Sequence, residues 1–203
     1  MDHPRELLAQ QMGHLADFFH GDRDNLRGRV ARALPAWTDG EDGYGLVLGL
    51  LSFGFEECGD YGRGEELGRR ALKIEPQDCW ARHAVVHVME MQARQEEGAR
   101  FMEDSAADWA QDDNGFAFHN WWHTALFHLD QDHVARALEL YDAVLAPGEE
   151  SVQLTLLDAA ALLWRLHLRG EDVGVRWCAL ADRYENLGEA GFYAFNDMHA
   201  MMA

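Results

Sequence analysis

Apolar residues recur at helical spacing along almost the whole chain, and this periodicity limits the fold more than any other feature of the sequence. Alternation of Val, Ile or Thr with polar residues, the pattern of half-buried strands, is absent. Three of the four prolines, Pro35, Pro76 and Pro147, follow helical stretches and stand where a helix should end. The sequence therefore predicts an all-α fold.

Short turn signals divide these helical stretches into pairs. The signals recur about every 34 to 39 residues, the range of tetratricopeptide-type helix–turn–helix repeats. They lie at Gly59–Asp60, Ala93–Arg94, Gln131–Asp132 and Gly170–Glu171. We expect one domain of tetratricopeptide-like antiparallel helical hairpins stacked in a right-handed superhelix. Its expected parts are a two-helix N-terminal extension (1–38), about four hairpins (43–186) and the start of a further helix (192–203).

Composition narrows the class of ligand. The formal net charge of −19 disfavours nucleic acid and anionic membranes, which both attract basic patches. Apolar runs are too short for a transmembrane helix, and the first residues lack the basic and apolar regions of a signal peptide. The three widely spaced cysteines form neither a disulfide framework nor a zinc ribbon. We therefore expect a cytoplasmic protein.

Four segments are similar to the tetratricopeptide repeat protein 38 family, and the resemblance extends over nearly the whole chain. They are Trp80–Met91, His119–His123, Leu157–Leu166 and Phe195–Ala200. The resemblance implies a tetratricopeptide-like superhelix and no established activity. Members of that family are about twice as long, so the resemblance also implies that the C-terminal half is missing here. A pocket completed by that half would then be open at one end.

The first candidate site residues are His83, His87 and Glu90. Residues four apart on a helix return to within about 40° of each other, so these three share one otherwise apolar stripe. Two imidazoles and a carboxylate can bind one divalent transition-metal ion or act in acid–base chemistry. The alternative is that the histidines bond to neighbouring carbonyl groups in a tight helix interface. The zinc-protease order H-E-x-x-H is absent.

His119 and His123 repeat this spacing, with Asn120 and Trp122 between them. Such a tryptophan suits either a pocket wall or packing between helices. If both histidine pairs face inward, the metal ligands would be His83, His87, Glu90, His119 and His123. This shared polar pocket is the main functional hypothesis from the sequence, and it does not by itself establish a cofactor.

Further polar residues extend the candidate site. Asp158 lies in an apolar helical stretch, where a carboxylate needs a partner; it could orient a histidine or pair with Arg165. Asn196 and His199 share a side if their segment is helical. Asp197 would point away from His199 and fits a helix cap equally well.

Two functions remain open at this stage. A helical-repeat binding module would accept a protein segment or small molecule on its concave face, the more common use of such folds. A metal-assisted or histidine-based hydrolase or lyase would use the same imidazoles, with Asp158 and Asp197 orienting them. We also expect a homodimer through a terminal helix, because an uncovered repeat end exposes apolar surface.

Overall fold

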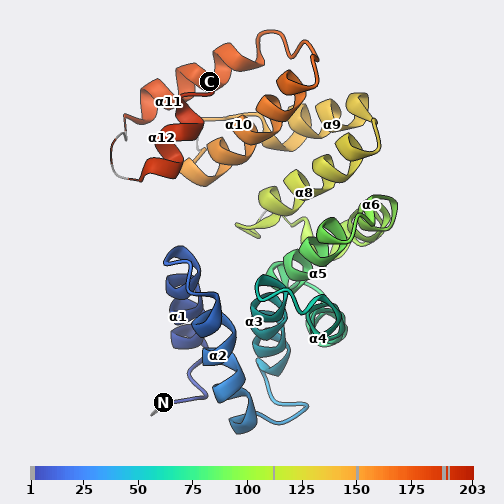
Figure 1. Ribbon diagram of the computed structural model, residues 1–203, viewed down its shortest axis with the longest axis vertical. Coiled ribbons are helices and arrows are strands. Elements are labelled where there is room, and N and C mark those ends of the chain that lie inside the picture. The colour runs from blue at the N-terminus through green and yellow to red at the C-terminus, as the bar shows by residue number, and fades with distance from the viewer. Residues whose placement is uncertain (1–2, 112, 150, 189–190, 192) are drawn as a thin grey trace. The chain divides into compact units, whose positions relative to one another are not determined.

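The computed structural model describes residues 3–111, 113–149, 151–188, 191 and 193–203. Their regular elements are all helices, which confirms the predicted all-α fold (Figure 1). The helices are α1 (Leu7–Phe19), α2 (Arg23–Ala33), η1 (Leu34–Ala36), α3 (Tyr44–Glu57), α4 (Tyr61–Ile74), α5 (Cys79–Met91), α6 (Gln95–Asp104), α7 (Ala106–Trp109), α8 (Ala117–Asp130), α9 (Val134–Leu140), the π-helical turn η2 (Tyr141–Leu145), α10 (Gln153–Leu168), α11 (Arg176–Leu187) and α12 (Ala194–Ala200). Residue 192, the expected start of the last helix, lies outside the described residues.

Contacts divide the chain into two compact units, which we call unit 1 and unit 2. Unit 1 comprises Met1–Gly98 and Asp104–Phe116, and unit 2 comprises Ala99–Glu103 and Ala117–Ala203. In unit 1, α3 packs against α2, α4 and α5. In unit 2, α10 packs against α8, α11 and α12. Each histidine pair therefore lies in its own unit, on α5 or on α8.

One turn geometry joins five successive helix pairs. In each turn the backbone N–H after a left-handed residue bonds to the carbonyl five residues back, which terminates a helix in the Schellman manner. The left-handed residues are Gly21, Gly59, Ala93, Asp132 and Gly170. The bonds are Asp22 N to Asp17 O, Asp60 N to Phe55 O, Arg94 N to Met89 O, His133 N to His128 O and Glu171 N to Leu166 O. The same turn thus recurs in both units, including between α1 and α2.

In the α3–α4 hairpin of unit 1, the two helices are so close that a serine hydroxyl of α3 bonds to the backbone of α4. The buried Ser52 side chain donates a hydrogen bond of 2.6 Å to the carbonyl oxygen of Gly64. A Cβ atom at Gly68 would lie 2.5 Å from Val85 Cγ2 and 2.7 Å from Ser52 Oγ. Glycine at position 68 therefore allows α4 to pack against both α3 and α5.

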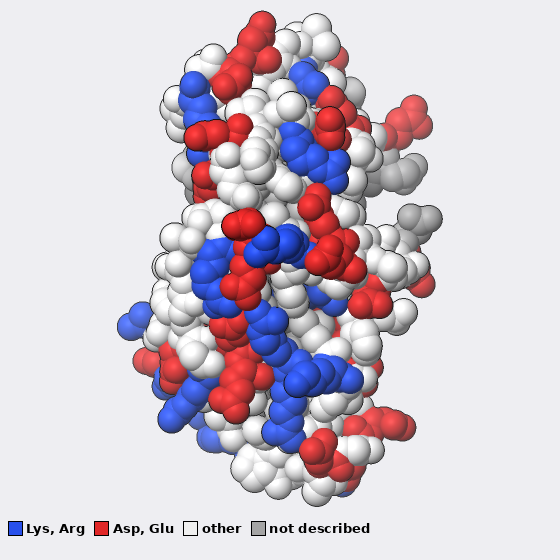
Figure 2. All heavy atoms as spheres, turned by 90° about the vertical axis from the view of Figure 1, so that its right-hand side faces the viewer, with Lys and Arg blue, Asp and Glu red and all other residues white. Residues whose placement is uncertain are grey.

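Many arginine side chains form ion pairs with the more numerous acidic side chains. On the face drawn in Figure 2 the two kinds are interspersed. In unit 1, Arg94 donates to both carboxylate oxygens of Glu65 at 2.7 and 2.9 Å, which lowers the pKa of Glu65 to about 2. In unit 2, Arg176 forms a two-pronged bond with Asp142 at 2.8 and 2.6 Å. Among the described residues, no helix has the length and apolar character needed to cross a membrane.

Candidate functional site: two histidine pairs

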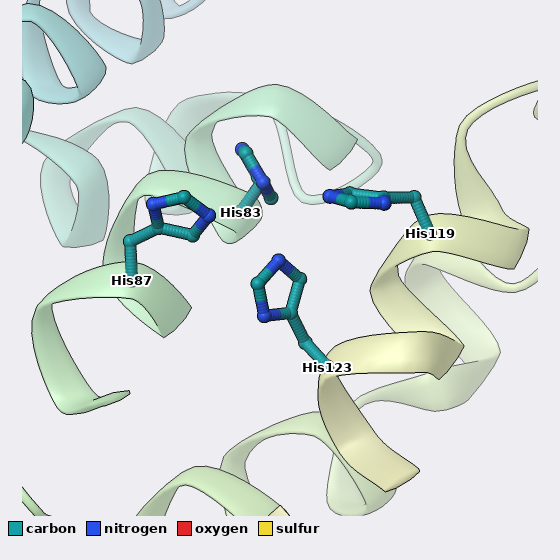
Figure 3. A group of neighbouring side chains, drawn as sticks. All are labelled: His83, His87, His119 and His123. Carbon is teal, nitrogen blue, oxygen red and sulfur yellow. The ribbon is translucent and has the colours of Figure 1, made fainter. Parts of the chain in front are cut away.

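The first histidine pair lies in the middle of α5. This helix begins at Asp78, whose Oδ1 accepts the backbone N–H groups of Trp80 and Ala81 at 2.9 and 3.1 Å. His83 and His87 follow on neighbouring turns, and their ring centroids are 4.1 Å apart (Figure 3). His83 is buried, whereas 26% of the His87 side chain is exposed. The expected side-by-side arrangement of this pair is therefore present within the helix.

Aromatic rings surround the first pair. Phe53 of α3 contacts the rings of both His83 and His87, at centroid distances of 5.3 and 5.7 Å. Trp80 and Phe116 add rings 5.4 and 5.2 Å from His83. These contacts restrict the rotation of the imidazoles, which are held in a mostly apolar frame. Phe53 and Phe116 were not predicted as part of the site.

The carboxylate that the structure places beside His87 comes from α3. Glu56 Oε2 lies 3.4 Å from His87 Nδ1, and Glu57 follows at the last position of the same helix. Burial, together with the charge of Glu56, raises the pKa of Glu57. The carboxylate predicted from the sequence was instead Glu90, a partly buried residue three positions further along α5. Neither Glu56 nor Glu57 was among the predicted site residues.

The second histidine pair lies on α8. The ring centroids of His119 and His123 are 4.8 Å apart, and the two rings are nearly perpendicular (Figure 3). Trp122 stacks on His119 at 5.3 Å with an interplanar angle of 17°, and its edge meets His123 at 4.9 Å. Asn120 is fully buried on the same helix. Trp122 thus holds both imidazoles in place.

Asp158 of α10 orients the first imidazole of this second pair. Its Oδ2 lies 2.9 Å from His119 Nδ1, within one unit and with the carboxylate mostly buried. Arg165, the alternative partner, instead donates to the Ala161 carbonyl oxygen and lies over the Trp122 ring at 5.3 Å. The contact with the Asp158 carboxylate fixes the orientation of the His119 ring. Such carboxylate–histidine pairs are typical of metal-binding and acid–base sites.

The α12 residues are engaged within their own segment. The Asp197 carboxylate accepts the backbone N–H of Gly191 at 3.0 and 3.1 Å. Asp197 lies within the first turn of α12, and Tyr193 holds the N-cap position that was expected of Asp197. His199 is buried, and its Nδ1 donates to the Phe195 carbonyl oxygen at 2.8 Å. Asn196 directly precedes Asp197 in α12 and is partly buried. The structure therefore does not bring Asp197 and His199 together.

These features define a tetratricopeptide-like helical-repeat protein. Comparison with known proteins found no protein-family model that matches the chain. Similar solved structures include a putative kinesin light chain of Podosopora anserina with nearly identical tetratricopeptide-like repeats, at 12% sequence identity and a TM-score of 0.64. That likeness covers 94% of this chain and 100% of the other. A point variant of the same protein gives 13% identity and a TM-score of 0.65, covering 93% and 100%. At these identities the likeness shows the fold.

Proposed function

We propose that the chain is a helical-repeat binding module that binds its ligand, a protein segment or a small molecule, through the two histidine pairs. The observation that carries the proposal is that both helices hold two imidazole rings side by side, with centroids 4.1 and 4.8 Å apart. Tetratricopeptide-like folds serve mainly in binding, and the resemblance to the tetratricopeptide repeat protein 38 family supports a fold of this kind.

A divalent transition-metal ion is the simplest ligand with which to test the pairs. Imidazole nitrogen suits zinc, and two imidazoles one helical turn apart can approach one ion. His83 and His87 would contribute from α5, and His119 and His123 from α8, where Asp158 fixes the orientation of His119. The single site shared by both pairs remains a prediction from the sequence. We propose that Glu90, Asn120 and Trp122, which neighbour the histidines in sequence, also take part in binding the ligand.

We expect metal-free protein to bind zinc stoichiometrically in isothermal titration calorimetry. A His87→Ala, His123→Ala double variant should lose this binding, whereas His167→Ala should retain it, because His167 is exposed on α10 and belongs to neither pair. Asp158→Asn should weaken binding roughly 10- to 100-fold, the usual cost of losing a group that orients a ligand. A wild-type chain that binds no zinc, or a double variant with wild-type affinity, would overturn the proposal. Circular dichroism checks that each variant remains helical.

The Asp158–His119 contact supports a second function, a metal-assisted or histidine-based hydrolase or lyase. A carboxylate bonded to an imidazole is a common general acid–base arrangement. Hydrolysis of 4-nitrophenyl acetate by zinc-loaded protein would favour this function if the activity disappeared in His119→Gln and survived in His167→Ala. Absence of such a difference would leave the binding module as the better proposal.

A further inference from the structure

We propose that unit 1 contains a divalent-cation site formed by Glu56, Glu57 and His87, at the C-terminal end of α3 and the middle of α5. Each residue can offer one ligand atom, and the three atoms lie within 4.8 Å of one another. This inference rests on the proposed function in one respect, because His87 also belongs to the first histidine pair. The cation site differs from the proposed histidine site because it requires the carboxylates of Glu56 and Glu57.

Glu56 gives the strongest support for a cation site. The residue is only 6% exposed, and its Oε2 has no hydrogen-bond donor among the described residues. The nearest basic atom is His87 Nδ1, at 3.4 Å. A buried carboxylate oxygen without a donor is costly, because no protein group replaces the water that solvated it. A cation between Glu56 and His87 would supply the compensating charge.

The position of the two carboxylates in α3 supports the same inference. Glu56 and Glu57 are the last two residues of the helix, which Cys58 caps before the turn at Gly59. The C-terminal end of a helix carries partial negative charge and favours cations over anions. Two glutamates at this end therefore oppose the helix dipole as well as each other. A divalent cation bound there would reverse both unfavourable interactions.

The donor set indicates the class of cation. Two carboxylates and one imidazole suit manganese, iron, cobalt or zinc in the divalent state, whereas calcium and magnesium prefer oxygen ligands alone. Phe53, one turn before Glu56 on α3, packs against the His87 ring at 5.7 Å and limits its rotation. His83, with its ring 4.1 Å from that of His87, is close enough to add a further nitrogen. The site thus has a restrained nitrogen ligand next to two carboxylates.

Manganese is the most discriminating probe, because it binds carboxylate-rich sites in preference to sites made of imidazoles alone. We expect the metal-free chain to remove the six-line electron paramagnetic resonance signal of one equivalent of Mn²⁺. Glu57→Gln should weaken this binding by at least about tenfold, since loss of a direct ligand should cost no less than loss of a residue that only orients a ligand. Glu66→Gln, an exposed glutamate on α4 in the same unit, should bind as wild type.

The outcomes separate this inference from the proposed function. Wild-type manganese affinity in Glu57→Gln, or no manganese binding by the wild-type chain, would overturn the site. If zinc binding still depended on the histidine pairs, the proposed function would survive that failure. Conversely, loss of manganese binding in Glu57→Gln but not in His119→Ala, His123→Ala would support a site confined to unit 1. Glu57 is partly exposed, so its conservative variant should fold even if Glu56→Gln does not.

Discussion

Replacing Gly68 with alanine should lower the free energy of unfolding by about 2 kcal/mol. Its Cβ would lie 2.5 Å from Val85 Cγ2 and 2.7 Å from Ser52 Oγ, both shorter than any normal contact. Relief requires that α4 move away from α5 or that Ser52 rotate, which would break its buried hydrogen bond to Gly64. Overpacking of this kind costs up to about 3 kcal/mol, and the higher helix propensity of alanine offsets at most about 1 kcal/mol.

Gly62 provides the matched control in the same helix. No described heavy atom lies within 4 Å of the position that its Cβ would take. Gly62→Ala should therefore leave stability unchanged or raise it by up to about 1 kcal/mol. Urea unfolding followed by far-ultraviolet circular dichroism measures both variants. Equal stabilities for Gly68→Ala and Gly62→Ala would show that the hairpin does not need a glycine at position 68.

Acidification should reveal the buried His14 of α1. This residue has no solvent exposure, and its Nε2 accepts a hydrogen bond from Trp80 Nε1 at 3.2 Å. Burial lowers the pKa of His14 from 6.5 to about 4. Below pH 6.5 this histidine binds a proton in the unfolded chain, whereas in the folded chain it stays neutral until about pH 4. The contribution of His14 is thus complete above pH 6.5 and is lost toward pH 4, by about 3 kcal/mol.

His14→Gln removes this titration while retaining an acceptor for Trp80. The variant should lose less stability than wild type between pH 6.5 and 4, as measured by urea unfolding at each pH.

Asp78→Asn should have the opposite effect, so that this variant loses more stability than wild type on acidification. Burial raises the pKa of Asp78 to about 6. Protonation of this carboxyl group therefore raises the free energy of unfolding of the wild-type chain as pH falls from 6 toward 3.8. Asparagine still caps α5 but cannot provide this gain. Parallel pH profiles for wild type and both variants would contradict this assignment.

Helix and turn positions were the part of the fold most accessible from sequence. Helical periodicity and helix-ending residues are local signals, and the hairpin turns lie at the residues that carry them. Ala93 and Asp132 occupy left-handed positions that glycine fills in the equivalent turns, so the repeat of residue types is weaker than the repeat of geometry. This explains why the repeats look degenerate in sequence.

The candidate site was predictable only where its members share one helix. Spacing of four residues placed His83 beside His87 and His119 beside His123, because a single helix fixes that geometry. The partners that other helices supply to these histidines could not be predicted from residue spacing. Asp158 could be assigned to a histidine or to Arg165 only once α8 and α10 were seen together. Glu56 and Glu57 were missed because nothing local connects them to α5, although two acids at a helix end were a usable signal.

The recurring helix-terminating turn also makes the protein easy to label. At Gly21, Gly59 and Gly170 no described heavy atom lies within 4 Å of the position of an added Cβ, and each residue sits between two helices in a conformation that only a few residue types adopt readily. These three glycines are exposed, so short peptide tags inserted at these turns would face solvent. Fluorophores attached at Gly59 and Gly170, one in each unit, could then follow the separation of the units in solution during metal titration.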